Sequence, residues 1–240
     1  MKIQTIETEQ EIILEEILEG LSKPQKTLPS KLFYDERGSL LFDEICKLDE
    51  YYLTKTEIKI MQDNINEIAS CIGEKKILVE RGSGNSVKIR LLIEHLPHLA
   101  AYIPVDISEE HLIKSSKALQ DDYPELEISS LVTDYTQWFT LPEIERPYNS
   151  IQAFYPGSTI GNFTPEEAKN FLERISRICG KESGLLIGVD LKKDKRILYN
   201  AYNDSKGITA EFNLNILHHI NNIFDADFNV NNFHHCADYN

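Results

Sequence analysis

The sequence predicts an α/β fold in which a mostly parallel sheet carries helices on both faces. Between residues 77 and 190, short apolar runs alternate with amphipathic helical patterns in the order β-α-β-α-β-β-α-β. This alternation is typical of doubly wound sheets. The flanking segments show helical periodicity only. We therefore expect an α/β core at residues 76–193, a helical part at 1–75, and a helical continuation at 194–240.

Three amphipathic helices are expected before the sheet, over residues 7–22, 38–48 and 55–73. The first is expected to end near Gly20. Gly73 is suited to end the third, because glycine readily adopts the left-handed conformation that closes a helix.

Five apolar runs are expected to form the strands of the core, and three helices to connect them. The runs are residues 77–79, 101–106, 127–132, 151–155 and 184–190. The connecting helices are expected at about 86–96, 108–120 and 165–179. Ser108 is a candidate N-cap, and Pro165 suits a first helical turn.

Composition excludes several classes of protein. The 240 residues include 25 basic and 39 acidic side chains, a formal net charge of -14, which disfavours a protein that grips nucleic-acid backbones. The four cysteines form no CxxC pair, so we expect reduced thiols rather than a structural zinc site. We find no signal peptide and no apolar run long enough to span a membrane. A cytoplasmic protein is expected.

Glycines follow the first predicted strand of the core, in the segment ILVERGSGNS. Gly82 and Gly84 permit a sharp turn and a close approach of backbone N–H groups to a ligand. Asp106, at the end of the second strand, is suited to accept the hydroxyls of a ribose. Dinucleotide sites usually carry a third glycine where this chain has Val87. An S-adenosyl-L-methionine (SAM) site, a dinucleotide site and a turn without a ligand all remain open interpretations.

Two further strand ends carry polar residues. Asp134 and Tyr135 follow the third strand, where a carboxylate and an aromatic ring suit an adenine; an exposed turn is the alternative. AFYPGSTIGNF follows the fourth strand, and Asn162 there offers both hydrogen-bond donors and acceptors. The alternative for this segment is the start of a helix at Thr164-Pro165.

The chain resembles the histidine-specific methyltransferase family, whose type member is the histidine Nα-methyltransferase of ergothioneine biosynthesis. The resemblance runs from about residue 27 to residue 240. It rests on ordered segments that include LPSKLFYDERGSLLFDEI, LDEYYLTKTE, LVERGSGNSVKIRLL, YIPVDIS, GSTIGNFTPEEAKNFL and AYNDSKGITAEFNLNILHHIN. It implies a class I (Rossmann-like) methyltransferase sheet with a helical substrate-binding domain.

The resemblance also implies roles for particular residues at the methyl donor, SAM. Gly82, Gly84 and Lys88 would lie along its methionine part. Asp106 would hold the ribose, and Asp134 with Tyr135 the adenine. These six positions form the expected cofactor site.

The substrate implied by the resemblance is a small amino acid, histidine or a relative. Asn162 and Tyr202 would bind its carboxylate and amine, and Tyr34 and Tyr51 would close the pocket. Tyr34 and Asn162 are the candidate catalytic residues, because neutral oxygens can orient the lone pair of an uncharged amine. The chain has 11 tyrosines, so packing is the alternative for each of them.

Two departures from the family pattern stand out. Arg81 replaces an apolar residue before the first glycine, and we expect it to point to solvent or to pair with an acid. The alternative is that it faces the donor pocket, where it would repel the positive sulfonium. Family members continue beyond the last residue of this chain, so we expect the last strands of the sheet to be missing and a complementing chain to be possible. No metal is expected, because the paired histidines 218–219 and 234–235 lack the spacing of helical ligands.

The leading hypothesis is a SAM-dependent N-methyltransferase that acts on the α-amine of histidine or a related amino acid. The first alternative is a truncated, catalytically inactive ligand-binding relic or fragment of such an enzyme. The second is a dinucleotide oxidoreductase, which Val87 disfavours.

Overall fold

The computed structural model describes residues 1–6, 10–84 and 86–239. The chain divides into two compact units. We call Met1–Ile6 with Leu53–Asp190 the sheet unit, and Glu7–Tyr52 with Leu191–Asn240 the helical unit. The predicted boundary at residue 75 differs from this division, because a first strand and a long helix from that segment belong to the sheet unit.

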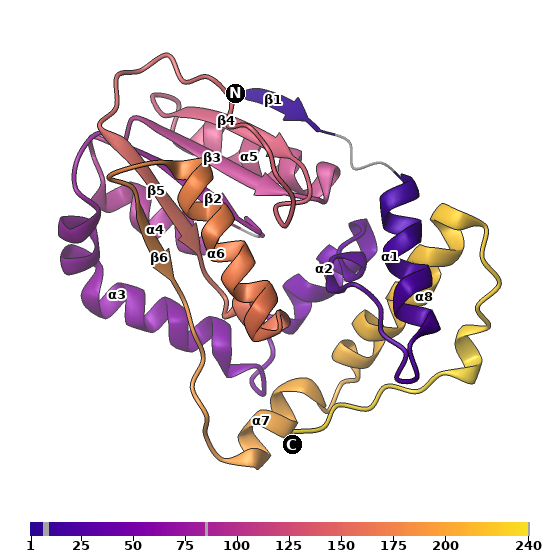
Figure 1. Ribbon diagram of the computed structural model, residues 1–240. Helices are drawn as coiled ribbons and strands as arrows, with labels where there is room; N and C mark the ends of the chain where they lie inside the picture. The colour runs from indigo at the N-terminus through magenta and orange to yellow at the C-terminus, as the bar shows by residue number, and fades with distance from the viewer. Residues whose placement is uncertain (7–9, 85, 240) are drawn as a thin grey trace. The chain divides into compact units, whose positions relative to one another are not determined.

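The sheet unit contains a six-stranded parallel sheet (Figure 1). In spatial order its strands are β1 (Lys2–Thr5), β4 (Glu127–Val132), β3 (Ala101–Asp106), β2 (Lys76–Arg81), β5 (Ser150–Tyr155) and β6 (Gly184–Ile187). Every pairing is parallel. The predicted order of strands and helices from residue 77 onward is confirmed. The edge strand β1 was missed, because its four exposed residues, KIQT, carry no strand pattern.

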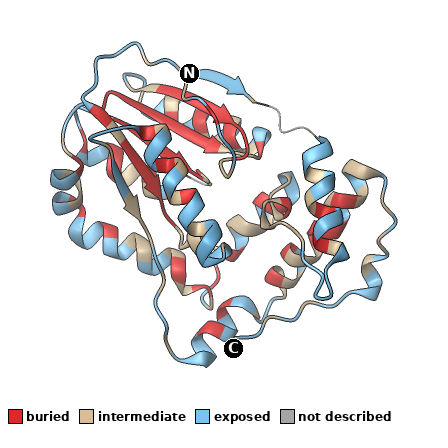
Figure 2. Ribbon diagram, in the orientation of Figure 1, coloured by how far each residue is buried: buried red, intermediate tan, exposed pale blue. Residues whose placement is uncertain are grey.

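Helices cover both faces of this sheet. On one face, α3 (Tyr52–Ile72), α4 (Val87–His95) and α5 (Glu109–Asp122) pack on the side chains of Leu78, Tyr102, Ile128 and Phe154. On the other face, α6 (Pro165–Cys179) packs on Ala153 and Tyr155. Figure 2 shows the buried residues concentrated in the central strands.

Two predicted helix starts differ in how they are capped. Thr164 begins α6 with a reciprocal capping box, in which its hydroxyl accepts from the N–H of Glu167 and the Glu167 carboxylate accepts from the N–H of Thr164. Ser108 precedes α5 as expected, but its side chain makes no capping hydrogen bond.

The helical unit is built from α1 (Gln10–Ser22), α2 (Glu36–Ile45), α7 (Lys195–Tyr202) and α8 (Ile208–Phe224). Its core contains Ile17, Leu32 and Ile216. Residues 7–9, which open the first predicted helix, lie outside the described residues. The helix ends at Ser22, the last residue of its predicted range and two residues past Gly20, so Gly20 does not itself end it. Gly20 instead permits a close approach, because a Cβ there would lie 2.2 Å from the carbonyl oxygen of Thr27.

Short 3₁₀ turns complete the chain at Ser30–Phe33, Thr159–Asn162 and Val230–Asn232. Within the described ranges, no helix has the length and apolar character needed to cross a bilayer.

Candidate functional site

The carboxyl end of β2 leads into the predicted glycine turn. Gly82 and Gly84 have φ angles of +73° and +47°, a region that side chains strain to occupy. The N–H of Gly82 donates to the carbonyl of Val105 on β3, at 2.9 Å. A Cβ placed on Gly84 would meet nothing within 4 Å, so open space lies beside this backbone. The turn therefore leaves room for a ligand at the sheet edge.

Asp106 lies beside this turn, at the end of β3. Its carboxylate accepts the backbone N–H of Ser108 at 3.0 Å and lies close enough to the N–H of Gly84 to interact with it. Burial raises the pKa of Asp106, while these backbone donors act in the opposite direction. The structure thus brings Asp106 and Gly84 together, as the sequence predicts.

Asp134 and Tyr135 occupy the turn after β4. The buried Asp134 carboxylate accepts from both the backbone N–H and the hydroxyl of Thr136, at 2.8 and 2.6 Å. The Tyr135 ring packs edge-on against Tyr155, with ring centroids 6.1 Å apart. A Cβ on Gly82 would lie 3.8 Å from this ring, so the aromatic side chain borders the glycine turn.

Arg81 is buried rather than exposed, and among the described residues it forms no ion pair with an acid, so both expectations for it are wrong. It is 1% exposed on the face that α6 covers, with its guanidinium over the rings of Phe139 and Phe171. Its Nη1 donates to the carbonyl of Tyr135 at 3.1 Å. Burial lowers the pKa of Arg81. Arg81 therefore stabilises the Asp134–Tyr135 turn through a hydrogen bond to its backbone.

Glu80, on the opposite face of β2, is an acid that the sequence analysis missed. It is 2% exposed and accepts a hydrogen bond from the Tyr102 hydroxyl. Burial raises the pKa of Glu80 to about 8, although the bond from Tyr102 opposes this effect. Its position at the end of β2, two residues before Gly82, was the available signal.

Lys88, in the first turn of α4, pairs with Glu57 of α3. The Glu57 carboxylate also accepts the backbone N–H of Gly157, which follows β5. Sequence reasoning missed Glu57 as well, although it lies in the segment LDEYYLTKTE that carries the resemblance. Asn162, the remaining predicted residue of this unit, is exposed at the end of the turn Thr159–Asn162.

The helical unit brings its three predicted tyrosines into one aromatic cluster. Tyr34 packs against Phe42, Phe42 packs against Tyr51, and Tyr51 packs against Tyr202, with ring centroids 5.6, 6.2 and 6.1 Å apart. Phe212 of α8 contacts both Tyr34 and Phe42. Segments far apart in the sequence thus meet at these rings.

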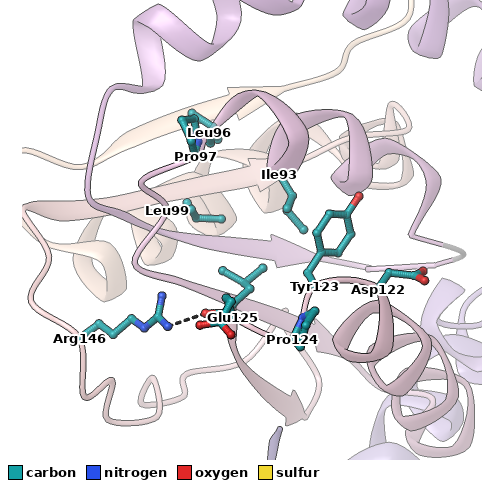
Figure 3. Close-up of a pocket in the computed structure, with 10 residues that line it drawn as sticks. Ile93, Leu96, Pro97, Leu99, Asp122, Tyr123, Pro124, Glu125 and Arg146 are labelled. Carbon is teal, nitrogen blue, oxygen red and sulfur yellow. Dashed lines mark hydrogen bonds between the residues drawn. The ribbon is translucent and has the colours of Figure 1, made fainter.

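A cavity of about 350 Å³ lies elsewhere, near the amino ends of β3 and β4 (Figure 3). Leu99, Tyr123 and Arg146 are among its lining residues, and Arg146 donates to the carbonyl of Glu125. None of the predicted site residues lines it. In the part of the chain that the structure describes, no group of three or more His, Cys, Asp and Glu side chains is arranged to hold a metal ion.

Comparisons with known proteins identify the family of this chain. The model of the family described as "Histidine-specific methyltransferase, SAM-dependent" matches residues 13–240. A histidine N-alpha-methyltransferase of Mycobacterium tuberculosis is 40% identical over 228 residues, covering 94% of this chain and 70% of that protein. Ergothioneine biosynthesis protein 1 of Neurospora crassa is 37% identical over 222 residues, covering 89% of this chain and 25% of that protein.

Among solved structures, a putative SAM-dependent methyltransferase of Methanococcus maripaludis is similar at a TM-score of 0.48 and 18% identity. The match covers 86% of this chain and 87% of that one. This similarity is too loose to carry an argument, whereas the family model spans nearly the whole chain. The chain belongs to the SAM-dependent histidine-specific methyltransferase family.

Proposed function

We propose that this chain transfers a methyl group from SAM to the α-amine of histidine or a closely related amino acid. The observation that carries the proposal is the meeting of Asp106, Tyr135 and the Gly82–Gly84 turn at one edge of the sheet. The names of the two relatives support histidine as the acceptor and ergothioneine biosynthesis as the pathway.

The residues present at the sheet edge fit the chemistry of the donor. SAM supplies an electrophilic methyl group on a sulfonium when it is bound. Asp106 offers a carboxylate to the ribose hydroxyls, and Lys88 an ammonium to the donor carboxylate. The open side of Gly84 leaves the space that a close ligand needs. Asp134 and Tyr135 complete the set with an acceptor for the adenine amine and an aromatic face.

Amino-acid recognition is assigned to Tyr34, Tyr51, Tyr202 and Asn162. All four are neutral, so they can donate to a carboxylate and accept from an amine without repelling the sulfonium. Positioning supplies much of the rate in such a transfer, because nitrogen, methyl carbon and sulfur must be in line. Tyr34 and Asn162 would orient the lone pair of the uncharged amine.

The direct test is to incubate the purified chain with SAM and histidine and to detect methylated histidine by mass spectrometry. Histamine, which lacks the carboxylate, is the matched control substrate and should react far less. Equal methylation of both compounds would contradict carboxylate recognition. A folded chain that binds S-adenosylhomocysteine but methylates no free amino acid would contradict the proposed activity.

A cytoplasmic location and a complementing chain stay predictions. A free amino acid as the substrate requires neither a nucleic-acid surface nor a membrane anchor, which agrees with the acidic composition.

A further inference from the structure

Glu57 holds two groups at the carboxyl edge of the sheet at once. Its Oε2 pairs with the ammonium of Lys88, and both of its oxygens lie 2.9 Å from the backbone N of Gly157. The side chains of Glu57 and Lys88 are 17% and 16% exposed, so water screens this pair only weakly. The contact therefore differs from the exposed ion pair two residues further along α3, between Lys59 and Asp63.

The backbone around Glu57 leaves room for this carboxylate. A Cβ on Gly188, just after β6, would lie 1.8 Å from Oε1 of Glu57, so any side chain there would displace the carboxylate. Gly157 has a φ of +82°, and a Cβ on it would lie 3.6 Å from the Lys88 ammonium. Gly188 thus leaves the space that the Glu57 carboxylate occupies, whereas a Cβ on Gly157 would be in ordinary van der Waals contact with the ammonium.

The ion pair of Glu57 and Lys88 lies where the strand order of the sheet reverses. The chain leaves β2 toward β3 and β4 and later returns on the other side of β2 to form β5 and β6. Strand order reverses between β2 and β5, and open α/β sheets bind ligands at such a switch point. Lys88 begins the helix after β2, and Gly157 follows β5, so Glu57 links the two sides of the switch point.

We propose that Glu57 is a positioning residue for the methyl donor. Its carboxylate fixes the Lys88 ammonium and the Gly157 turn at the switch point, so that Lys88 meets the carboxylate of the donor's amino-acid end. A free lysine side chain samples many rotamers, and the Glu57 contact removes most of that freedom before the ligand arrives. This proposal rests on the proposed function, because it takes the switch point as the donor site.

The test compares two ligands by calorimetric titration of the full chain. S-Adenosylhomocysteine carries the amino-acid end, whereas 5′-methylthioadenosine has the adenine, ribose and sulfur without it. Glu57→Gln keeps the shape of the side chain but removes its charge. It should weaken S-adenosylhomocysteine binding about tenfold, the usual effect of losing one charge-assisted contact. Its affinity for 5′-methylthioadenosine should equal that of the unmodified chain.

Asp63→Asn is the matched control, since it also converts a carboxylate to an amide in an ion pair on α3. It should leave both affinities unchanged. Glu57→Asp, which keeps the charge on a shorter side chain, should recover part of the lost affinity. It also serves as the test variant if Glu57→Gln does not fold.

Three results would overturn the proposal. If Glu57→Gln binds S-adenosylhomocysteine as tightly as the unmodified chain does, Glu57 does not position the donor. An equal loss for both ligands would indicate a general structural role. Tighter binding of S-adenosylhomocysteine would mean that Glu57 competes with the ligand for Lys88. In all three cases the unmodified chain still binds; its failure to bind either ligand would instead overturn the proposed function, and this proposal with it.

Discussion

The sheet unit and the helical unit build their candidate binding groups in different ways. In the sheet unit, carboxylates at the carboxyl edge of the sheet are fixed by backbone N–H groups. Asp106 at the end of β3 accepts from Ser108, and Glu57 of α3 accepts from Gly157 after β5. In the helical unit the tyrosines pack ring against ring. Tyr34 contacts Phe42 and Phe212, Tyr51 contacts Phe42, and Tyr202 contacts Tyr51. Short loops therefore determine one set of positions, and packed helices the other.

From this contrast we expect the sheet unit to bind the donor and the aromatic cluster to bind the acceptor, and substitutions can test this separation. Changes at the strand ends should alter donor binding and leave the amino-acid acceptor alone. Changes in the aromatic cluster or in the caps that hold its helices should alter acceptor binding or the stability of the helical unit. A substitution that weakens the binding of donor and acceptor equally would contradict this separation of roles.

The largest effect is expected for Asp106→Ala. Loss of hydrogen bonds to a charged acceptor should weaken S-adenosylhomocysteine binding by about 1–3 kcal/mol, roughly 5- to 150-fold. Calorimetric titration measures this, with the exposed Asp121→Ala on α5 as the control. An unchanged affinity would reduce Asp106 to a structural residue of the β3 end.

The next effect concerns the stability of the helical unit. The Asp204 carboxylate accepts the backbone N–H groups of Lys206, Ile208 and Thr209, at 3.1, 3.0 and 2.8 Å, and so caps the start of α8. Asp204→Ala should lower the free energy of unfolding by about 0.5–2 kcal/mol. Denaturant titration measures the loss. Asp194→Ala removes one backbone hydrogen bond and an exposed ion pair, both to Arg196 at the start of α7, and should cost less.

The Asp204 effect should depend on pH. Burial acts to raise the pKa of Asp204, but the backbone donors outweigh it and hold the pKa below its ordinary value. A lowered pKa in the folded state means that the stabilisation is present above the unfolded-state pKa and is lost as pH falls through the folded-state pKa. The difference between Asp204→Ala and the unmodified chain should therefore shrink in acid, and a constant difference would contradict this account.

A smaller effect is expected for Tyr202→Phe. If the Tyr202 hydroxyl contacts the amino acid, its loss should raise the KM for histidine by a factor of about three to ten, the effect of one neutral hydrogen bond. Affinity for S-adenosylhomocysteine should stay the same. Tyr199→Phe, on the same helix and similarly exposed, is the control. A loss of donor affinity in Tyr202→Phe would show that the two sets of residues do not act separately.

The last effect is a pH dependence that originates in the sheet unit. Burial raises the pKa of Glu80 to about 8. A raised folded-state pKa contributes stability that is fully present below the unfolded-state pKa and is lost as pH rises through about 8. Glu80→Gln should therefore gain stability relative to the unmodified chain as pH rises. Thermal unfolding followed across that range measures the trend, and a parallel pair of curves would contradict it.

The donor end was more predictable from the sequence than the rest. Parallel strands place their carboxyl ends at one edge, so Gly82, Asp106 and Asp134 could be expected to lie close together. The alternation of strands and helices also predicted the order of elements from residue 77 onward. A local pattern was sufficient in both cases, because each element carries its own signal.

The missed features depend on long-range contacts. Lys88 and Glu57 lie on different helices and are 31 positions apart in the chain, so no local sequence pattern indicates that they pair. Arg81 was misassigned because its burial depends on Phe139 and Phe171, which arrive from a loop and from α6. The strand β1 forms only because the exposed edge of β4 offers it a partner.

The most direct test of the central claim is calorimetric titration of the purified chain with S-adenosylhomocysteine, first alone and then with histidine present. The account predicts binding that histidine tightens, because the strand-end residues hold the donor and the neutral acceptor groups hold the amino acid. No binding by a chain shown to be folded would contradict the assignment of Gly82, Gly84, Lys88, Asp106, Asp134 and Tyr135 to the donor site.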